Sequence, residues 1–358
     1  MGIFMGMIYK IILNNTIPTG IVNLISEIDE FKGRWEALKI IAPDRLSFLR
    51  KIATIASIGS STRIEGAKLS DSQVEELLSH IGKHSFRSRD EEEVLGYAEA
   101  MNVVFDSYPE IPITENYIKQ LHRILLRYSS KDQRHIGDYK KLPNNVDAYD
   151  EEGKHIGTVL ETATPFQTPH YMKELVEWYN IQIKKREFHP LLIIGAFIVH
   201  FLAIHPFQDG NGRLSRILTT LVLLKGGYQY VPFCSLESII EENKERYYLA
   251  LRRTQNSFKT DHAGMNEWIS FFLQTLKKQK DILQQRIERE KILLNSTITK
   301  IEQDILTLVN ERGRITNADV VILTNANRNT IKKHLKELVE KGIIKQHGIG
   351  KGTFYTKA

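Results

Sequence analysis

Two apolar runs of helix length lie in the middle of the chain, at residues 191–204 and 217–224. Each run is long enough for a buried helix, and both are too short to cross a membrane. The segment between them is polar and contains Pro206, which disfavours the α conformation for the residue before it. The pattern therefore predicts a helix that ends near His205, then a loop, then a second helix that begins near residues 211–212.

Apolar residues recur at helical spacing along most of the remaining chain, so the protein is predicted to be mainly α-helical. Gly33 and Pro43 interrupt this pattern near the N-terminus, and Thr114 is a predicted N-cap. Asp90 and Glu93 resemble a capping box at another helix start. Predicted helices cover residues 46–60, 69–81, 90–105, 114–126, 170–184 and 277–295.

Strand and turn signals are concentrated in residues 137–165, where asparagine, aspartate and glycine are frequent. Residues 155–164 are the predicted edge strand of a hairpin. A long surface loop, with a hairpin that has no function, is the alternative interpretation of this region.

The C-terminal residues have a pattern of their own. A short predicted helix at 317–323 and a turn at 324–327 precede a basic helix at 328–341, and two possible strands follow. This arrangement resembles a winged helix. Winged helices bind duplex DNA, but they also serve as dimerisation or protein-docking modules. The side chains that could meet phosphates or base edges are Arg328, Asn329, Lys332, Lys333 and Lys336.

The charge distribution supports a separate C-terminal domain. Of the net charge of +6, residues 299–358 carry eleven basic against six acidic side chains, and the other residues carry 38 against 37. The single cysteine, Cys234, excludes a disulfide framework and is expected to be a buried thiol in a reducing compartment. Residues 1–13 are apolar but lack the basic start and cleavage site of a signal peptide. We therefore expect a cytoplasmic protein without a membrane segment.

The polar segment between the two central runs combines side chains suited to phosphate transfer. Its glycines, at the start of a predicted helix, let a phosphate approach free backbone amides. His205 is a base that titrates near neutral pH, and Asp209 is a ligand for a hard cation. Arg213 and Arg216 lie three residues apart on one helix face and can neutralise phosphate charge. The segment therefore predicts a nucleotide site.

From His205 to Arg216 the sequence is HPFQDGNGRLSR, which matches the pattern His-x-Phe-x-(Asp/Glu)-Gly-Asn-Gly-Arg-x-x-Arg at every constrained position. The chain thus resembles the Fic family. The resemblance implies transfer of AMP from ATP, with Mg2+, to a Ser, Thr or Tyr hydroxyl of a protein target. The interpretation without chemistry is a tight turn between two core helices.

The resemblance gives each motif residue a role. His205 would accept the proton of the attacking hydroxyl, Asp209 would hold Mg2+, and Phe207 would anchor the loop in the core. The residues expected to bind the phosphates are Gly210, Asn211, Gly212, Arg213 and Arg216. Similarity to relatives also places Asn243 and Tyr247 in the adenine pocket, although a half-buried helix with Tyr247 in the core explains them equally well.

A second match lies upstream. Ser61, Glu65 and Gly66 fit (Ser/Thr)-x-x-x-Glu-(Gly/Asn), the inhibitory pattern of many Fic proteins. Ser61 and Glu65 are one helical turn apart, and Gly66 is a natural helix end. The resemblance implies that Glu65 pairs with Arg216, so that ATP binds unproductively. The alternative is an ordinary helix end with a solvated glutamate.

The predicted fold is a Fic-type helical core with a small β-hairpin flap, followed by a winged helix-turn-helix. We expect four regions: an N-terminal helical region with the inhibitory helix, a catalytic core, a connecting helix and the winged helix, at residues 1–110, 111–276, 277–298 and 299–358. In the resemblance, the hairpin at 155–164 holds the backbone of a protein target by strand addition. The pair Tyr139-Lys140 stands where relatives often have Tyr-Arg.

Several other activities remain open. A kinase or choline-phosphate transferase could use the same fold, although the intact Gly-Asn-Gly-Arg argues against the kinase variant. The site could also remove AMP, with Glu65 orienting water. A further alternative is a transcriptional regulator that senses nucleotide and binds duplex DNA through residues 328–341. A homodimer that relieves inhibition by Glu65 is another option.

Overall fold

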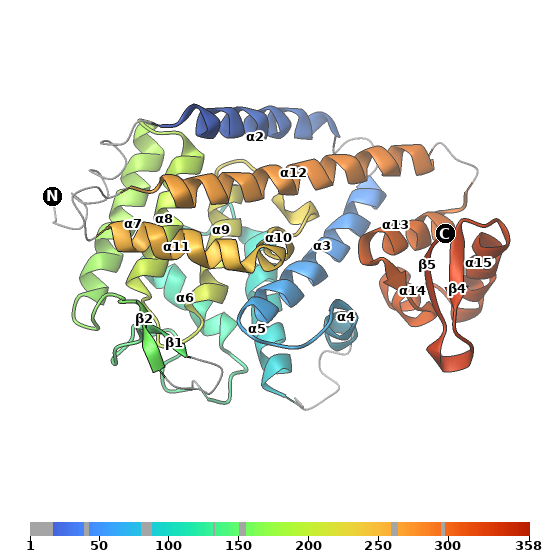
Figure 1. Cartoon of the computed structure of the whole chain (residues 1–358), viewed down its shortest axis with the longest axis horizontal. Coiled ribbons are helices and arrows are strands. Elements are labelled where there is room, and N and C mark those ends of the chain that lie inside the picture. The colour runs from blue at the N-terminus through green and yellow to red at the C-terminus, as the bar shows by residue number, and fades with distance from the viewer. Residues whose placement is uncertain are drawn as a thin grey trace. The chain divides into compact units, whose positions relative to one another are not determined.

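The computed structural model of the protein describes residues 17–38, 43–79, 88–131, 133–149, 155–258, 264–294 and 298–358. These residues are mostly helical, as the sequence predicts (Figure 1). The chain divides into two compact units, of which the first comprises Met1–Leu69 and Phe86–Ile282. The second comprises Ser70–Ser85 and Leu283–Ala358. The four predicted region boundaries stay predictions.

The first unit is a helical assembly around the two central apolar runs. Its helices are α2 (Thr19–Leu38), α3 (Pro43–Ile64), α5 (Arg89–Ser107), α6 (Glu115–Leu125), α7 (Thr168–Lys185), α8 (Pro190–Ile204), α9 (Asn211–Lys225), α10 (Leu236–Glu242), α11 (Lys244–Ser257) and most of α12 (Asn266–Leu294). Helices α8 and α9 pack on each other, α7 covers α8, and α5 packs on α9 and α3. The predicted boundaries of α8 and α9 are confirmed. His200 of α8 is fully buried and hydrogen-bonds the carbonyl of Ala196, so it is a histidine of the core.

Local signals fix most helix ends, but three predictions need correction. The predicted helix at 277–295 does not begin at 277, because α12 runs without a break from Asn266. Thr114 caps α6 as predicted, by accepting a hydrogen bond from the Tyr117 amide. Gly33 does not interrupt α2, because the helix continues through it. The predicted capping box at Asp90 and Glu93 is wrong. Ser88 caps α5 instead, and the Glu93 carboxylate binds arginine side chains.

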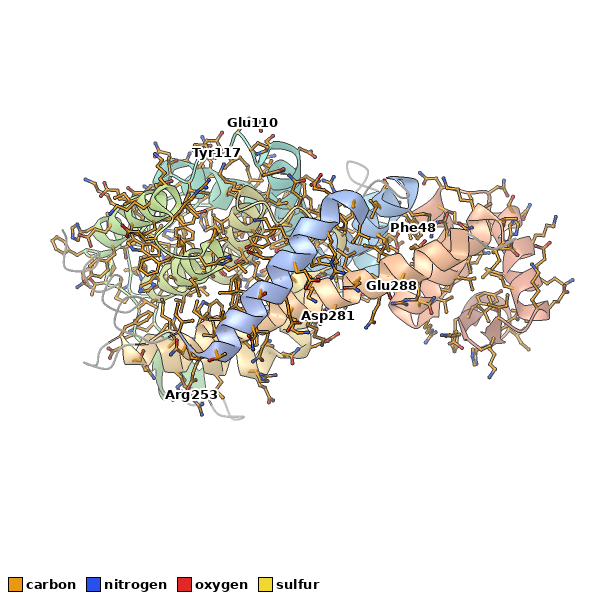
Figure 2. The ribbon with its side chains drawn as sticks, turned by 90° about the horizontal axis from the view of Figure 1, so that it is seen from above. Phe48, Glu110, Tyr117, Arg253, Asp281 and Glu288 are labelled. Atoms are coloured by element: carbon orange, nitrogen blue, oxygen red, sulfur yellow. The ribbon has the colours of Figure 1, made fainter. Side chains whose placement is uncertain are left out.

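Helix α2 crosses over α12 on one side of this unit, beside Asp281 (Figure 2). Lys277 of α12 pairs with Glu27 of α2 at 3.0 Å and donates to Asp281 at 2.8 Å. On the inner face of α2, Phe31 and Trp35 contact the ring of Tyr230. Since these rings are buried, α2 is held mainly by apolar packing, and the exposed ion pairs add little.

The predicted hairpin is confirmed. Strands β1 (Val146–Tyr149) and β2 (His155–Leu160) pair antiparallel, with Val146 opposite Leu160 and Tyr149 opposite His155. The predicted edge strand 155–164 is too long, because pairing ends at Leu160. The register shifts at two points, so this is a short and irregular ribbon.

The second unit contains the helix-turn-helix and wing. Its elements are α4 (Asp71–Ser79), the end of α12, α13 (Lys300–Arg312), β3 (Arg314–Ile315), α14 (Asn317–Thr324), α15 (Arg328–Glu340), β4 (Ile344–His347) and β5 (Phe354–Lys357). The strands form an antiparallel sheet in the order β3-β5-β4. The sequence predicts two strands at residues 343–346 and 353–356, and each begins one residue later in the structure. The two-residue β3 was too short to predict. Helix α4 belongs here because Arg312 pairs with Glu75 at 2.8 Å, with both side chains largely buried.

Helices α5 and α6 cross so closely that Gly96 cannot carry a side chain. A Cβ at Gly96 would lie 2.0 Å from the backbone oxygen of Leu125. We expect Gly96→Ala to lower the free energy of unfolding by about 1–3 kcal/mol, because overpacking must displace backbone. Denaturant unfolding measures the loss.

The matched control is Gly33→Ala in α2, where a Cβ meets no atom within 4 Å. It is expected to raise stability by roughly 0.5–1 kcal/mol through helix propensity alone. Equal effects of the two substitutions would contradict the close crossing.

Candidate active site

The motif loop is held in a left-handed backbone conformation at both ends. His205 directly follows α8 with φ +52°, and its amide donates to the Phe201 carbonyl at 2.9 Å. Gly210 directly precedes α9 with φ +79°, where a side chain would be strained. A non-glycine residue in this region persists only when its surroundings hold it there. The fold therefore fixes the catalytic candidate His205 at some energetic cost.

Two side chains of the motif loop, Asn211 and Phe207, hold its backbone in place. The Asn211 amide group donates to the Phe207 carbonyl at 2.7 Å and its oxygen accepts from the Phe207 amide at 2.9 Å. Asn211 was expected to cradle phosphates, but its buried side chain serves the loop backbone in this structure. Phe207 is fully buried, as predicted for the anchor of the loop.

His122 of α6 packs against the motif loop and binds it. The sequence analysis did not predict this residue. Its ring stacks on Phe207 at a centroid distance of 3.9 Å. Nδ1 accepts from the Gly137 amide, so Nε2 carries the proton and donates to the Asp209 carbonyl at 3.0 Å. No motif signals such a residue, because it lies more than eighty positions from its partner along the chain.

His205 is a neutral base at physiological pH. Burial lowers the pKa of its imidazole to about 4; the charge of Lys140 also lowers it, while a hydrogen bond to the Leu202 carbonyl, Glu65 and Asp209 raise it. With Nδ1 3.3 Å from the Leu202 carbonyl, the proton belongs on Nδ1 and the lone pair on Nε2. A ring in this state can accept a proton from a hydroxyl group.

Arg216 is buried and is bound by the end of α3. Its Nη2 donates to Glu65 Oε1 at 2.7 Å and to the Ser61 carbonyl at 2.9 Å, and its Nε donates to Ser61 Oγ at 2.7 Å. The predicted partner of Arg216 is therefore in contact with it. Gly66 has φ +105° and ends this segment, as its position in the pattern predicted.

The Glu65 carboxylate lies against the start of α9. A Cβ at Gly212 would be 2.2 Å from Glu65 Oε1, so the missing side chain leaves the space that this carboxylate fills. The free amides at a helix start favour a negative charge. The Glu65 carboxylate therefore lies beside the helix start at which the sequence predicts a phosphate.

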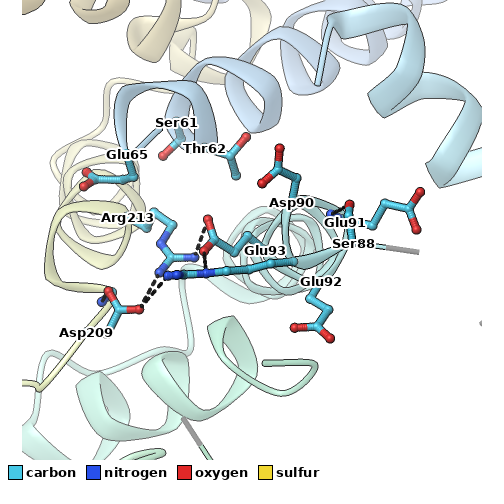
Figure 3. Close-up of polar contacts among 12 residues, drawn as sticks. Ser61, Thr62, Glu65, Ser88, Asp90, Glu91, Glu92, Glu93, Asp209 and Arg213 are labelled. Atoms are coloured by element: carbon cyan, nitrogen blue, oxygen red, sulfur yellow. Dashed lines mark hydrogen bonds and ion pairs between the residues drawn. The ribbon is translucent and has the colours of Figure 1, made fainter. Parts of the chain in front are cut away.

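A second carboxylate binds the other motif arginine (Figure 3). Arg213 lies between Glu93 of α5 and Asp209, with Nη1 3.1 Å from Glu93 Oε2 and Nη2 3.3 Å from Asp209 Oδ2. Arg89 bridges the same two carboxylates, at 2.7 Å from Glu93 and 3.4 Å from Asp209. Burial raises the pKa of Asp209. The charges of Arg213 and Arg89 and the hydrogen bond from the Gly210 amide lower this pKa by more, so it lies below its usual value.

This network makes Asp209 an ionised oxygen ligand beside the loop. Its side chain is about one-third exposed, and one of its oxygens accepts from the Gly210 amide at 2.6 Å. Mg2+ is usually bound by one or two carboxylates together with substrate phosphates and water. Asp209 fits that role. Glu93 and Arg89 were missed because nothing in the sequence links α5 to the motif.

The two adenine-pocket candidates lie in different surroundings. Tyr247 is buried and packs against Trp268 and Phe271, which is the core position that the alternative interpretation gave it. Asn243 is half-buried and donates to the Ile239 carbonyl. The neighbouring Tyr248 is 44% exposed and is the aromatic ring of this pair that a base could reach. The roles of Asn243 and Tyr247 in nucleotide binding stay predictions.

Comparison with known proteins agrees with this geometry. Residues 112–223 match the Fic/DOC family, and residues 298–345 match a winged helix-turn-helix family described as DNA-binding. The chain therefore carries a Fic/DOC domain followed by a winged helix-turn-helix domain.

Cys234 is buried, as expected. None of the described helices has the length and apolar character needed to cross a bilayer.

Curated relatives are adenylyltransferases. Over 230 residues the chain is 27% identical to the protein adenylyltransferase Fic of Drosophila mojavensis, an alignment that covers 64% of this chain and 42% of the relative. A probable protein adenylyltransferase of Aquifex aeolicus is 27% identical over 125 residues, which are 32% of this chain and 36% of the relative. The chain thus spans less than half the length of these relatives.

Solved structures share the fold. A Fic family protein from Desulfovibrio desulfuricans G20 aligns with a TM-score of 0.59 and 24% identity, over 96% of this chain and 97% of that one. A Fic domain containing signaling protein from Bacteroides thetaiotaomicron gives a TM-score of 0.59 and 23% identity, over 73% and 97%. At these identities the likeness establishes the fold alone.

The state of His205 is open to direct measurement. We expect its ring to stay neutral in the folded protein down to a midpoint near pH 4, because burial penalises the imidazolium. Since the unfolded chain binds this proton at about pH 6.5, the free energy of unfolding should fall as pH drops between the two values. Ring NMR signals, assigned by comparison with His205→Ala, report the titration.

The same titration in urea is the control, because the unfolded ring should then change near pH 6.5. A midpoint near that value in the folded protein would contradict the prediction, because it would show that burial does not lower the pKa of this ring.

Proposed function

We propose that the protein is an adenylyltransferase that moves AMP from ATP to a Ser, Thr or Tyr hydroxyl of a protein, and that Glu65 inhibits it. The proposal rests on the position of the Glu65 carboxylate, which binds Arg216 at 2.7 Å and fills the space beside Gly212. A solvated glutamate at an ordinary helix end would need neither contact. The adenylyltransferase relatives support the same activity.

In the proposed reaction the hydroxyl oxygen attacks the α-phosphorus of ATP. A new P–O bond forms, the bond to the bridging oxygen of the β-phosphate breaks, and pyrophosphate leaves. The hydroxyl proton passes to the neutral His205. The amides at the start of α9 bind phosphate oxygens, and the missing side chains of Gly210 and Gly212 allow the approach.

The motif arginines and a cation neutralise the negative charge of the phosphates. Arg213 and Arg216 bind the β- and γ-phosphates. Asp209 would hold Mg2+, which when bound neutralises charge on the phosphates and the leaving pyrophosphate. The partial exposure and ionised state of Asp209 suit this role.

Inhibition follows from competition for one guanidinium. The γ-phosphate and the Glu65 carboxylate both need the same face of Arg216, so ATP can bind only in a displaced pose while Glu65 is in place. Arg216 would not become an isolated buried cation without Glu65. The Ser61 contacts remain, and buried Glu237, which accepts from Tyr97 at 3.1 Å, also lowers the energy of the cation.

The test uses ATP labelled at the α- or the γ-phosphate, with Mg2+, on wild type and Glu65→Gly. We expect α-label on protein, at least about tenfold more in Glu65→Gly, because a contact of roughly 1.5–3 kcal/mol to a charged group is removed. His205→Ala in the Glu65→Gly background should abolish the label. Scintillation counting of the protein band measures it.

Glu110→Gly, an exposed glutamate in the turn after α5, is the matched control and should behave as wild type. Label from the γ-phosphate would mean kinase chemistry. Loss of a pre-formed AMP adduct, without new labelling, would favour AMP removal. If neither label is transferred and calorimetry still shows ATP binding, the site is a nucleotide sensor.

DNA binding is the second candidate function, favoured by the winged-helix match and by the exposed side chains of α15. Arg328, Asn329 and Lys332 are exposed at the start of this helix. Lys333 and Lys336 are exposed too, but each lies within 4 Å of a glutamate one turn later, so their charge is partly compensated. Lys332 is the better phosphate contact.

For DNA binding, we expect Lys332→Ala to weaken duplex binding evenly across sequences and to reduce the salt slope by about one. Fluorescence anisotropy at several salt concentrations measures both. The control Lys184→Ala, on α7 of the first unit, should change neither. Undetectable or salt-insensitive binding would assign the winged helix to protein docking instead.

A further inference from the structure

Lys140 is buried beside the candidate active site, next to the end of α8. Its side chain has only 3% exposure, which is rare for lysine. The ammonium donates to three oxygen atoms: Asn144 Oδ1 at 2.7 Å, Thr162 Oγ1 at 2.9 Å and the Ile204 carbonyl at 3.0 Å. An ammonium has three N–H donors, and here each has an acceptor.

The three acceptors belong to three separate segments of the chain, and the ammonium fixes the positions of these segments relative to one another. Asn144 stands two residues before β1, and Thr162 stands two residues after β2. Ile204 is the last residue of α8, directly before His205. One ammonium therefore joins both ends of the hairpin to the residue that precedes the candidate base.

Further hydrogen bonds extend this junction. Asn144 Nδ2 donates to the carbonyls of His205, at 3.1 Å, and Phe207, at 2.6 Å. The Thr162 hydroxyl donates to Asn144 Oδ1 at 2.9 Å, and the Lys140 amide donates to the Pro206 carbonyl at 2.9 Å. The base of the hairpin and the motif loop are thus one polar cluster, with Lys140 at its centre.

We propose that Lys140 is a positioning residue of the transfer reaction, which holds the hairpin at a fixed distance from His205. The inference rests on the proposed function and on the expectation that the hairpin holds the backbone of the protein target beside His205. Because a shift of about 1 Å in a reacting group can cost a rate on the order of 100-fold, a loose hairpin would slow transfer without weakening ATP binding.

The cluster needs Lys140 in its charged form. A neutral amine has only two N–H donors, so one of the three acceptors would be left without a partner. The titratable group that faces Lys140 from the motif loop is His205, whereas the nearby Glu115 of α6 is engaged by Tyr139. Burial alone lowers the pKa of Lys140 to about 8, so the cluster should loosen as the pH rises above that value.

The experiment compares Lys140→Met, Lys140→Arg and Lys141→Met in the Glu65→Gly background. Lys141 is the adjacent, exposed lysine and is the matched control. We expect Lys140→Met to lower α-label transfer by on the order of tenfold to 100-fold, with the ATP dissociation constant changed less than about twofold. Lys140→Arg should keep most of the activity, because it retains charge and donors. Lys141→Met should match its parent.

The pH profile separates positioning from mere stability. With lysine, transfer should decline above about pH 8, and with arginine this decline should be absent, since its guanidinium stays protonated. Hydrogen exchange of the β1 and β2 amides gives a second readout that needs no activity. It should accelerate in Lys140→Met and stay unchanged in Lys141→Met.

If Lys140→Met fails to fold, Thr162→Val, which removes one acceptor, takes its place in both assays. Unchanged hairpin exchange and unchanged transfer in these variants would overturn the inference, as would the same alkaline decline with lysine and arginine. Absence of transfer in the Glu65→Gly parent would instead refute the proposed function. Faster hairpin exchange would then still support Lys140 as the residue that fixes the hairpin.

Discussion

A guanidinium as deeply buried as that of Arg216 needs acceptors and negative charge close by, because an uncompensated buried charge is very costly. In this protein the last turn of α3 supplies both, through the Ser61 hydroxyl and carbonyl and the Glu65 carboxylate. Helix α3 itself is held by its packing on α5 and α10. In the proposed function, a nucleotide that binds Arg216 displaces only the Glu65 carboxylate, while Ser61 and Glu237 continue to compensate the buried charge.

The motif loop is rigid for a different reason. Its left-handed residues, His205 and Gly210, stand at the two ends of a segment whose centre, Phe207, is stacked on His122. Asn211 inside the loop and Asn144 outside it both bind the Phe207 carbonyl. Because the strained backbone is held by packing and hydrogen bonds together, the amides at the start of α9 keep their direction without a ligand.

Both motif arginines bind carboxylates from helices that precede the family match. Glu65 comes from the end of α3, and Glu93 comes from α5. Opposite charges in this alternating network keep Asp209 ionised and Arg213 oriented. The chain before residue 112 is therefore part of the electrostatics of the site, although the Fic/DOC match begins there.

The sequence by itself determined the helical class, the boundaries of α8 and α9, and the residues of the motif loop. Periodicity, Pro206 and the glycines act locally, so they can be recognised without a fold. The same holds for Ser61, Glu65 and Gly66, whose spacing is that of one helical turn. The helix-turn-helix was predictable too, while the two-residue β3 was not.

Only the tertiary structure decided which distant side chains serve the loop. His122, Glu93, Arg89 and Lys140 each reach it from another element, and contacts across many residues leave no periodic trace in the chain. Tertiary contacts also overrode local signals at Glu93, which binds Arg213 and Arg89 in place of capping α5. They placed Tyr247 in the aromatic core for the same reason, since burial of a ring against Trp268 and Phe271 depends on packing.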